Sequence, residues 1–573
     1  MVSENNDRDT RSRRWLLRTL GAGTTVGIAG CTGNAPQDET TTSGGGGGGD
    51  TTESNDGGGD ETTTSGGGSS SEMATFVNAR NQVLTHLDPQ AINDSTLVQL
   101  GLVYDQLMDY APEDPTELRP QLATSWEPQN GGEQWVFGLR KGVTFDDGTK
   151  FDAYAARRSL ERAKALTVGQ SKPYEWYDSV EETGDYEITI HCNGAFGPAP
   201  AALSFITASI MNPTLLDEHK DDEHLGHEFF KTNVDGTGPY ELVNWDKGNE
   251  LVLNLKDSHW RADQSDLPDN LAIPDNANIG KYRNTIVREQ LTQKQKLARG
   301  DVDLARDLTW TNMKEVIQED GVDLYEGPVD IYNKYVFMMC QREPTSDVHF
   351  RKALAYAADY KGIAEELVNT AVPWGTPWPE GIWPRVTEGR YSRDLDKAKQ
   401  HLDKSVYDGE EIKFRSIKGS ENDKVGEALV ANFKEIGVPV DHEDIPWADL
   451  YEQLTSQETM PDLLMYNGWP DYPDPNGPAV RYWGDYWPPN GWNTAYYKNE
   501  EYDKMFVEAR STGDREKRAE LYKKMQELVI DEVPIIWLFQ NKYIRAKNSS
   551  ISNMTYTPGE LQYIPVHKFN KSQ

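Results

Sequence analysis

The second half of the chain alternates between helical and extended hydrophobic patterns, and this alternation constrains the fold more than any other feature. Helices are predicted at 348–369, 394–401, 424–436, 447–454 and 515–530, and strands at 412–414, 438–440, 463–466 and 535–539. Strands that alternate with helices form a sheet covered by helices. The sequence therefore predicts an α/β fold.

The part of the chain before residue 348 reads as strands and turns with fewer helices. Strands are predicted at 75–78, 135–139, 187–190 and 250–255, and helices at 95–108 and 151–166. Asp146, Asp147 and Gly148 form a turn signal between two of these segments. The sequence contains no internal repeat, so the fold is not a repeat array.

The N-terminus carries an export signal. Arg13 and Arg14 precede a modest apolar run that ends in small residues followed by Cys31. A twin arginine before such a run is typical of export, and the cysteine is where a lipid is expected after cleavage. The run is shorter than the about 20 apolar residues that a membrane helix needs. Residues 1–31 are therefore predicted to be a twin-arginine signal with a lipobox.

Residues 32–72 consist mainly of Thr, Ser, Gly, Asp and Glu, and 44–49 are all glycine. Such a segment has almost nothing to bury and behaves as a flexible coil. We expect a disordered tether between a lipidated Cys31 and a folded body that begins near Met73. The protein would then be anchored at the outer face of the cell membrane.

The chain is strongly acidic, with 93 Asp and Glu against 58 Lys and Arg and a formal net charge of -35. This balance argues against nucleic acid, whose phosphates attract cations. Charge spread along the whole body favours adaptation to high salt, which screens carboxylate repulsion. Besides Cys31, only Cys192 and Cys340 are present, and the sequence leaves open whether they are free thiols or form a disulfide.

Motifs for catalysis are absent: the sequence has no G-x-S-x-G, no P-loop and no H-E-x-x-H. We therefore predict no catalytic residue and no cofactor. A polar cluster could suggest a zinc or nickel site, but a solvated polar segment is the favoured interpretation in so acidic a chain, and no metal site is predicted. The cluster consists of His219, Glu223, His224, His227 and Glu228.

Two loops are rich in Trp and Pro. Trp374 and Trp378 lie in the loop at 373–384, and Trp469 and Tyr472 follow the predicted strand at 463–466. Aromatic rings in rigid loops can form the walls of a ligand cleft. The alternative is that they only pack the loops onto the body, and the accumulation of rings favours a binding surface.

Several stretches along the body resemble those of a known family. They lie at 104–107, 120–126, 139–149, 236–240, 351–357, 469–475 and 514–518. With them, the chain resembles the extracytoplasmic solute-binding proteins of the oligopeptide/dipeptide/nickel class, family 5, which serve ABC importers. Its acidity points to a haloarchaeal member.

The resemblance implies a two-lobed fold like that of periplasmic binding proteins, of type II and the large cluster C form, with an extra subdomain inserted in lobe 1. Two strands would cross between the lobes, near 322–336 and near 534–541. The implied domains are lobe 1 at 73–325 with the insert at about 101–225, lobe 2 at 326–538, and a return to lobe 1 at 539–573.

The resemblance also implies ligand contacts between the lobes. In peptide-binding members an Asp in the loop that matches 469–475 holds the ligand amine, which makes Asp471 the first choice and Asp474 the second. Dipeptide-binding members carry an Arg for the ligand carboxylate in the loop that matches 416–421, where this chain has only Lys418. Lysine lacks the two-pronged geometry of arginine, so a dipeptide specialist is not favoured.

The expected function is a lipid-anchored receptor that delivers a peptide to the permease subunits of an ABC importer by hinge closure. It would act as a monomer, contact the membrane only through its anchor, and do no covalent chemistry. An oligosaccharide or a nickel complex is the alternative ligand within the class. An exported hydrolase acting on peptides or glycans is the alternative from another class.

Overall fold

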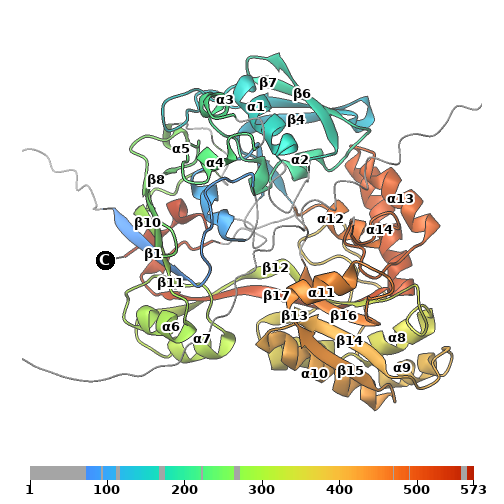
Figure 1. The fold of residues 1–573 in the computed structure, drawn as a ribbon. Helices are drawn as coiled ribbons and strands as arrows, with labels where there is room; N and C mark the ends of the chain where they lie inside the picture. Colours follow the sequence, from blue (N-terminus) through green and yellow to red (C-terminus); the bar gives the residue numbers. More distant parts are fainter. Residues whose placement is uncertain are drawn as a thin grey trace, which may run out of the picture. The chain divides into compact units, whose positions relative to one another are not determined.

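Two long antiparallel strands organise the fold. β12 (Val322–Met338) and β17 (Ile535–Asn548) pair along most of their length and lie in the middle of an 11-stranded sheet. One half of the pair joins the strands of lobe 1 and the other half joins those of lobe 2 (Figure 1). The crossings predicted near 322–336 and 534–541 lie on these two strands.

The computed structural model describes most of the body. The described ranges are 73–91, 95–110, 117–166, 174–220, 224–263, 267, 271–468, 470, 472–489, 491–555 and 564–572. The predicted signal, tether and lipid site, with Arg13, Arg14 and Cys31, lie outside them.

Lobe 1 is built on the half of the 11-stranded sheet that lies beyond β17. After β17 the strand order is β11-β1-β10-β9-β8, with β1 parallel to β10. The buried ring of Phe76 packs against Tyr282 and Phe569 in its core. The elements are β1 (Ala74–Arg80), β8 (Tyr240–Asp246), β9 (Glu250–Leu255), β10 (Ile279–Ile286), β11 (Leu304–Ala305), α6 (Gln290–Ala298) and α7 (Trp310–Val316).

A separate four-stranded sheet, in the order β4-β5-β7-β6, forms the core of the insert of lobe 1. Its alternating apolar residues, such as Phe137 and Ile188, face α1 and are fully buried. The elements here are β2 (Met108–Tyr110), β3 (Leu118–Pro120), β4 (Ala123–Gln129), β5 (Gln134–Leu139), β6 (Tyr177–Gly184), β7 (Glu187–Cys192), α1 (Ala153–Ala165), α2 (Ala199–Ala202) and α3 (Pro213–Glu218). Two short helices, α4 (His227–Phe230) and α5 (Trp260–Asp263), follow the insert in the chain.

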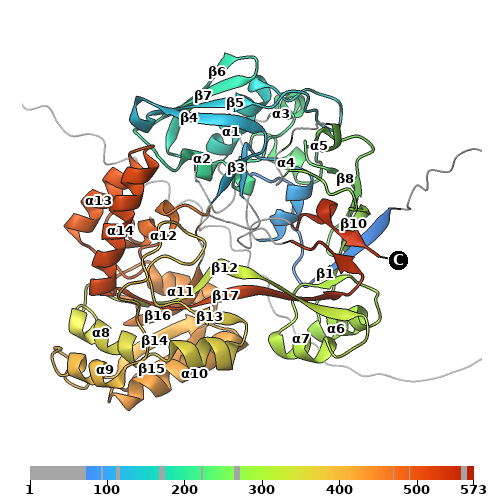
Figure 2. The ribbon, with the colours of Figure 1, turned by 180° about the vertical axis from the view of Figure 1, so that it is seen from behind.

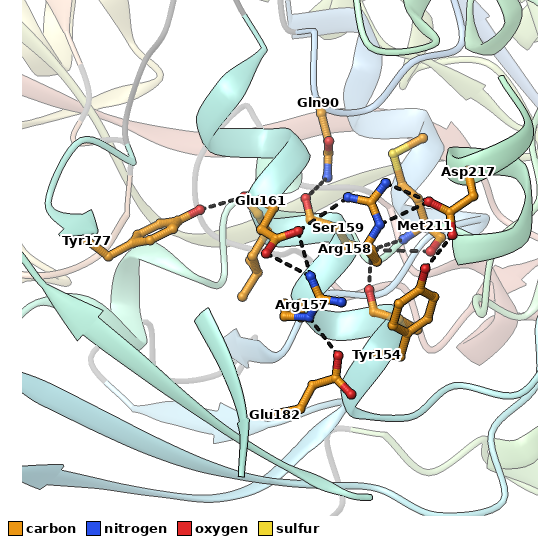
Figure 3. Close-up of polar contacts among 12 residues, drawn as sticks. Gln90, Tyr154, Arg157, Arg158, Ser159, Glu161, Tyr177, Glu182, Met211 and Asp217 are labelled. Atoms are coloured by element: carbon orange, nitrogen blue, oxygen red, sulfur yellow. Dashed lines mark hydrogen bonds and ion pairs between the residues drawn. The ribbon is translucent and has the colours of Figure 1, made fainter. Parts of the chain in front are cut away.

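Figure 3 shows how α1 is tied to its neighbours. Arg158 pairs with Asp217 of α3 at 2.7 Å, and Arg157 pairs with Glu182 of β6 at 2.6 Å and with Glu161 at 2.8 Å. These ion pairs are partly exposed, so each contributes only about 0–1 kcal/mol. Their cations are already matched by carboxylates of the chain, which makes this network structural.

Lobe 2 confirms the predicted α/β pattern. β14 is parallel to both β15 and β16, while β16 is antiparallel to β12. Its elements are β13 (Ala371–Pro373), β14 (Ile412–Ile417), β15 (Val440–Ile445), β16 (Leu463–Gly468), α8 (Val348–Ala357), α9 (Leu395–Leu402), α10 (Ser420–Glu435), α11 (Trp447–Leu454), α12 (Asn476–Ala479), α13 (Glu500–Arg510) and α14 (Arg515–Glu532).

The helix predicted at 348–369 is wrong as a single element. α8 ends at Ala357, because Ala358 takes an extended conformation with ψ 131°. The carboxylate of Asp359 then accepts a hydrogen bond from the backbone of Gly362, where a short π-helix (Gly362–Val368) begins. An aspartate that caps a new helix start divides the apolar pattern in two.

Cys192 and Cys340 are both free thiols in the structure. Burial raises the pKa of the Cys192 thiol to about 12, and Glu133 adds to this shift. Burial also raises the pKa of Cys340. Both thiols are therefore unreactive near neutral pH.

Candidate functional site

The candidate site is the edge of the lobe 2 sheet where its parallel strands end. β14 ends at Ile417, β15 at Ile445 and β16 at Gly468. Gly468 pairs with Asn333 of β12, so the crossing strands enter lobe 2 at the same edge. Ligands of open α/β sheets bind outside the carboxyl ends of the strands. We call this edge of lobe 2 the carboxyl edge.

Three exposed aromatic rings form a patch at the carboxyl edge. Trp447 begins α11 directly after β15, Tyr451 lies one turn further, and Trp492 stacks on Trp447 with ring centroids 6.3 Å apart. Their exposed fractions are 42%, 40% and 37%, and the buried ring of Tyr466 supports Trp447 from behind. Exposed rings on a rigid base can hold an apolar or planar group. Trp447 was not among the predicted ligand contacts; its place between a strand and a helix was the available signal.

A buried cation lies beside the crossing strands at the same edge. The side chain of Lys334 on β12 is 1% exposed and pairs with Glu421 of α10, with 3.2 Å between Nζ and Oε1. Nζ also donates to the side-chain oxygen of Asn422. Burial lowers the pKa of Lys334, although Glu421 opposes the shift. Lys334 was not predicted from the sequence, because β12 also carries Asp323, Glu326 and Asp330 and one more charge in it does not stand out.

The loop after β16 carries the residues predicted for the ligand amine. Trp469 and Asp471 lie outside the described residues. Tyr472 is buried in the hydrophobic core of the insert, so this loop passes from lobe 2 to lobe 1. Asp474 forms a buried ion pair with Arg518 of α14 at 2.6 Å. Burial disfavours the charge on Arg518, but Asp474 raises the pKa of Arg518. The carboxylate of Asp474 therefore already has a cationic partner within the chain.

The other predicted ligand contacts lie in different places. Trp374 and Trp378 are buried in the core of lobe 2, where the indole N–H of Trp374 donates to the carbonyl of Trp378 at 3.1 Å. Lys418 is exposed at the carboxyl edge, and its backbone N–H donates to the carbonyl of Ile445. The structure thus brings Lys418 to the edge and gives the two tryptophans a packing role. Their contact with a ligand stays a prediction.

A second contact joins the lobes at the far side of the insert. The backbone N–H of Gly197 donates to the carbonyl of Arg510 at the end of α13, with 2.7 Å between nitrogen and oxygen. Between α13 and α14, Thr512 and Gly513 lie against the insert, and a Cβ on Gly513 would be 2.8 Å from Pro128 Cβ. Both views show α13 beside the insert (Figure 1, Figure 2). We call this backbone contact the rim contact.

A serine, a histidine and a carboxylate meet near the carboxyl edge, but they are not arranged for nucleophilic catalysis. Ser416 Oγ lies 3.0 Å from His442 Nε2 and donates to the carboxylate of Asp444. A catalytic serine needs the imidazole between it and the acid. Here the fully buried hydroxyl bonds both groups directly, so the cluster is a structural polar network.

The polar cluster considered as a metal site is dispersed over separate contacts. His227 binds the buried carboxylate of Asp88 at 2.8 Å, and His219 stacks on Phe229. Glu228 pairs with Lys231. Within the described ranges, no group of three or more His, Cys, Asp or Glu side chains is placed to hold a metal ion. Glu223 lies outside those ranges.

The sheet, the crossing strands and the contacts between lobes define a two-lobed solute-binding fold. The family model of the bacterial extracellular solute-binding proteins, family 5 middle, matches residues 117–490. The chain therefore belongs to the bacterial extracellular solute-binding proteins, family 5, and is a substrate-binding receptor of the kind that serves ABC importers.

Similar proteins cover nearly the whole body. The probable D,D-dipeptide-binding periplasmic protein DdpA of Escherichia coli is 26% identical over 476 residues, which are 82% of this chain and 88% of that protein. The glutathione-binding protein GsiB of Shigella flexneri is 23% identical over 83% of this chain and 90% of its own length. Both are named as binding proteins rather than enzymes.

Solved structures share the fold at low identity. DppA of Helicobacter pylori, in complex with the peptide STSA, matches 87% of this chain and 98% of its own with a TM-score of 0.68 at 21% identity. CtaP of Listeria monocytogenes matches 88% of this chain and 100% of its own with a TM-score of 0.76 at 16% identity. Across the described ranges, no helix combines the length and the apolar character needed to cross a bilayer.

Proposed function

We propose that this protein captures a peptide between its two lobes outside the cell and passes it unaltered to an ABC importer. The observation that carries the proposal is the loop after β16, which starts at the carboxyl edge of lobe 2 and places Tyr472 in the core of the lobe 1 insert. A ligand at this edge would touch a segment that both lobes hold. Closure of the two lobes around it would bury the ligand and expel water.

Peptides are the favoured ligands because similar proteins are named for peptides and because the predicted contacts suit an amine and a carboxylate. DdpA and GsiB are named for peptides, and AppA of Bacillus subtilis, with the same fold, is in complex with a nonapeptide. Since Asp474 is paired with Arg518, we assign the ligand amine to Asp471, and Trp469 stays a predicted ligand contact. Lys418, exposed at the carboxyl edge, stays a predicted ligand contact.

The proposal places the receptor on the outer face of the cell membrane. Cys31 would carry the lipid after export through the signal at Arg13 and Arg14, and residues 32–72 would give the body lateral reach. The partners would be the permease subunits, met by a monomer. The acidity of the chain, whose formal charge is -35 over its whole length, would keep the receptor soluble in high salt.

The test is to titrate the purified body with peptides of two to nine residues, oligosaccharides and nickel–histidine, and to follow the melting temperature and the mass of each ligand. A binder gains RT ln(1 + [L]/Kd), which is about 2.7 kcal/mol at 100 Kd. We expect peptides alone to raise the melting temperature and to be recovered intact. Cleaved peptide would favour the exported hydrolase. A shift only with sugar or nickel would replace the proposed ligand.

A further inference from the structure

Lys334 is a buried cation that no function described so far requires. It lies where β12 enters lobe 2, between Asn467 of β16 and Phe539 of β17 in the register of the sheet. Its side chain is 1% exposed. A buried ammonium group without an anion is strongly unfavourable, so this position demands a negative charge close by.

The carboxylate that pairs with Lys334 is that of Glu421, and it is in contact with solvent. Glu421 is the second residue of α10, directly after the loop that leaves the carboxyl end of β14, and its side chain is 47% exposed. Its Oε1 lies 3.2 Å from Nζ of Lys334. An exposed carboxylate can leave this pair by rotating its side chain into water, whereas the buried ammonium cannot follow it.

We propose that Lys334 binds the carboxylate of the ligand, and that Glu421 holds the same place on the ammonium until that carboxylate replaces it. The inference rests on the proposed peptide-binding function. The exchange conserves charge, because one singly charged carboxylate leaves as another arrives. The buried ammonium is therefore paired at the start and at the end of the exchange, and the cost of an isolated buried charge does not oppose binding.

A neighbouring acceptor matches the rest of a peptide terminus. Lys334 and Asn467 are direct cross-strand partners, so their side chains lie on one face of the sheet. Asn467 donates from Nδ2 to the hydroxyl of Tyr332 at 2.6 Å, but its buried Oδ1 has no hydrogen-bond partner within the described part of the chain. A cation beside an unsatisfied acceptor suits a terminal carboxylate and the amide N–H that precedes it.

This assignment also accounts for the missing arginine. The loop at 416–421 offers only Lys418, which is exposed and therefore makes a weak, water-screened pair. Lys334 reaches the same carboxyl edge from the crossing strand and is desolvated there. A desolvated ammonium attracts a carboxylate far more strongly than an exposed one.

The test compares one peptide as the free acid and as the C-terminal amide by calorimetric titration of the full body. Wild type should bind the acid at least about tenfold more tightly, the factor expected of one charge-assisted hydrogen bond. Lys334→Met should abolish this preference, because only the binding of the free acid should become weaker. Glu421→Gln should tighten binding of the acid and leave the amide unchanged. Lys418→Gln is the matched control and should keep the preference.

Other results overturn the inference. If Lys334→Met keeps the preference, or if Lys418→Gln removes it, Lys334 is not the partner of the carboxylate. A purely structural pair would make Lys334→Met weaken acid and amide equally, and would make Glu421→Gln leave the affinity for the acid unchanged. Should Lys334→Met not fold, Glu421→Gln alone decides. A wild type that binds both forms equally refutes only this inference, whereas one that binds neither refutes the proposed function.

Discussion

Replacing Gly197 by alanine should weaken ligand binding without touching the ligand site. Gly197 belongs to the rim contact, and an added Cβ would collide with the carbonyl oxygen of Thr512 and lie 3.0 Å from its carbonyl carbon. It would also be 3.2 Å from Cδ of Arg518. A backbone carbonyl cannot rotate away as a side chain can, so the segment between α13 and α14 must withdraw from the insert.

The size of the effect follows from the cost of this withdrawal. Overpacking costs about 1–3 kcal/mol, and the hydrogen bond from Gly197 to Arg510 contributes about 0.5–1.5 kcal/mol. The two sides of the rim contact belong to different lobes, so the collision raises only the free energy of the arrangement in which they touch. Since apparent affinity falls with the population of the competent state, 1–3 kcal/mol corresponds to a rise of about 5- to 150-fold in Kd.

Calorimetric titration with a bound peptide measures the change in Kd, and a thermal melt of the free protein provides the check. We expect Gly197→Ala to keep the melting temperature of the free protein, because the lobes relieve the collision by separating. Gly184→Ala is the control: its Cβ would lie 3.4 Å from Glu187 Cβ, an ordinary contact within the insert. An unchanged Kd in Gly197→Ala, or a lower melting temperature with unchanged affinity, would refute this reasoning.

Three further changes test separate parts of the molecule. Asp88→Asn leaves the buried Arg162 unpaired and should lower the free energy of unfolding by about 3–5 kcal/mol in urea melts; a loss below about 1 kcal/mol contradicts the pairing. Burial and His349 lower the pKa of His401, so the folded state favours the neutral ring, and stability should fall as the pH drops below about 6.5. Melts of His401→Gln should lose only part of that pH dependence, because burial also lowers the pKa of His259 and of His567. Trp447→Ala should weaken the binding of peptides with aromatic side chains by about tenfold in titrations and leave the binding of polar peptides unaffected.

Local patterns predicted most elements of the fold because burial follows periodicity. The helix at 447–454 matches α11 residue for residue, and the strand at 463–466 lies within β16. β17 continues to Asn548, beyond the predicted end at residue 539, because its second half is polar and pairs with the first half of β12. The two halves of β17 belong to different lobes and have different hydrophobic patterns, so the length of the strand could not be predicted from one pattern.

The site was less accessible to sequence reasoning because its decisive contacts are long-range. Asp474 looked like a free ligand contact until the fold brought Arg518, 44 positions away, to within 2.6 Å. Lys334 and Asn422 are 88 positions apart. A charged residue in a strand that carries several charges gives no local sign of its partner. Pairing of this kind is decided only by sheet register and helix placement.

Backbone atoms and side chains have different roles in the contacts between the lobes. The rim contact uses backbone atoms and glycines, so it fixes how closely the lobes approach and discriminates little between ligands. The carboxyl edge instead offers side chains of several kinds, including Lys334 and Trp447. Because a backbone contact is indifferent to most substitutions, the side chains of the edge can change without disturbing closure.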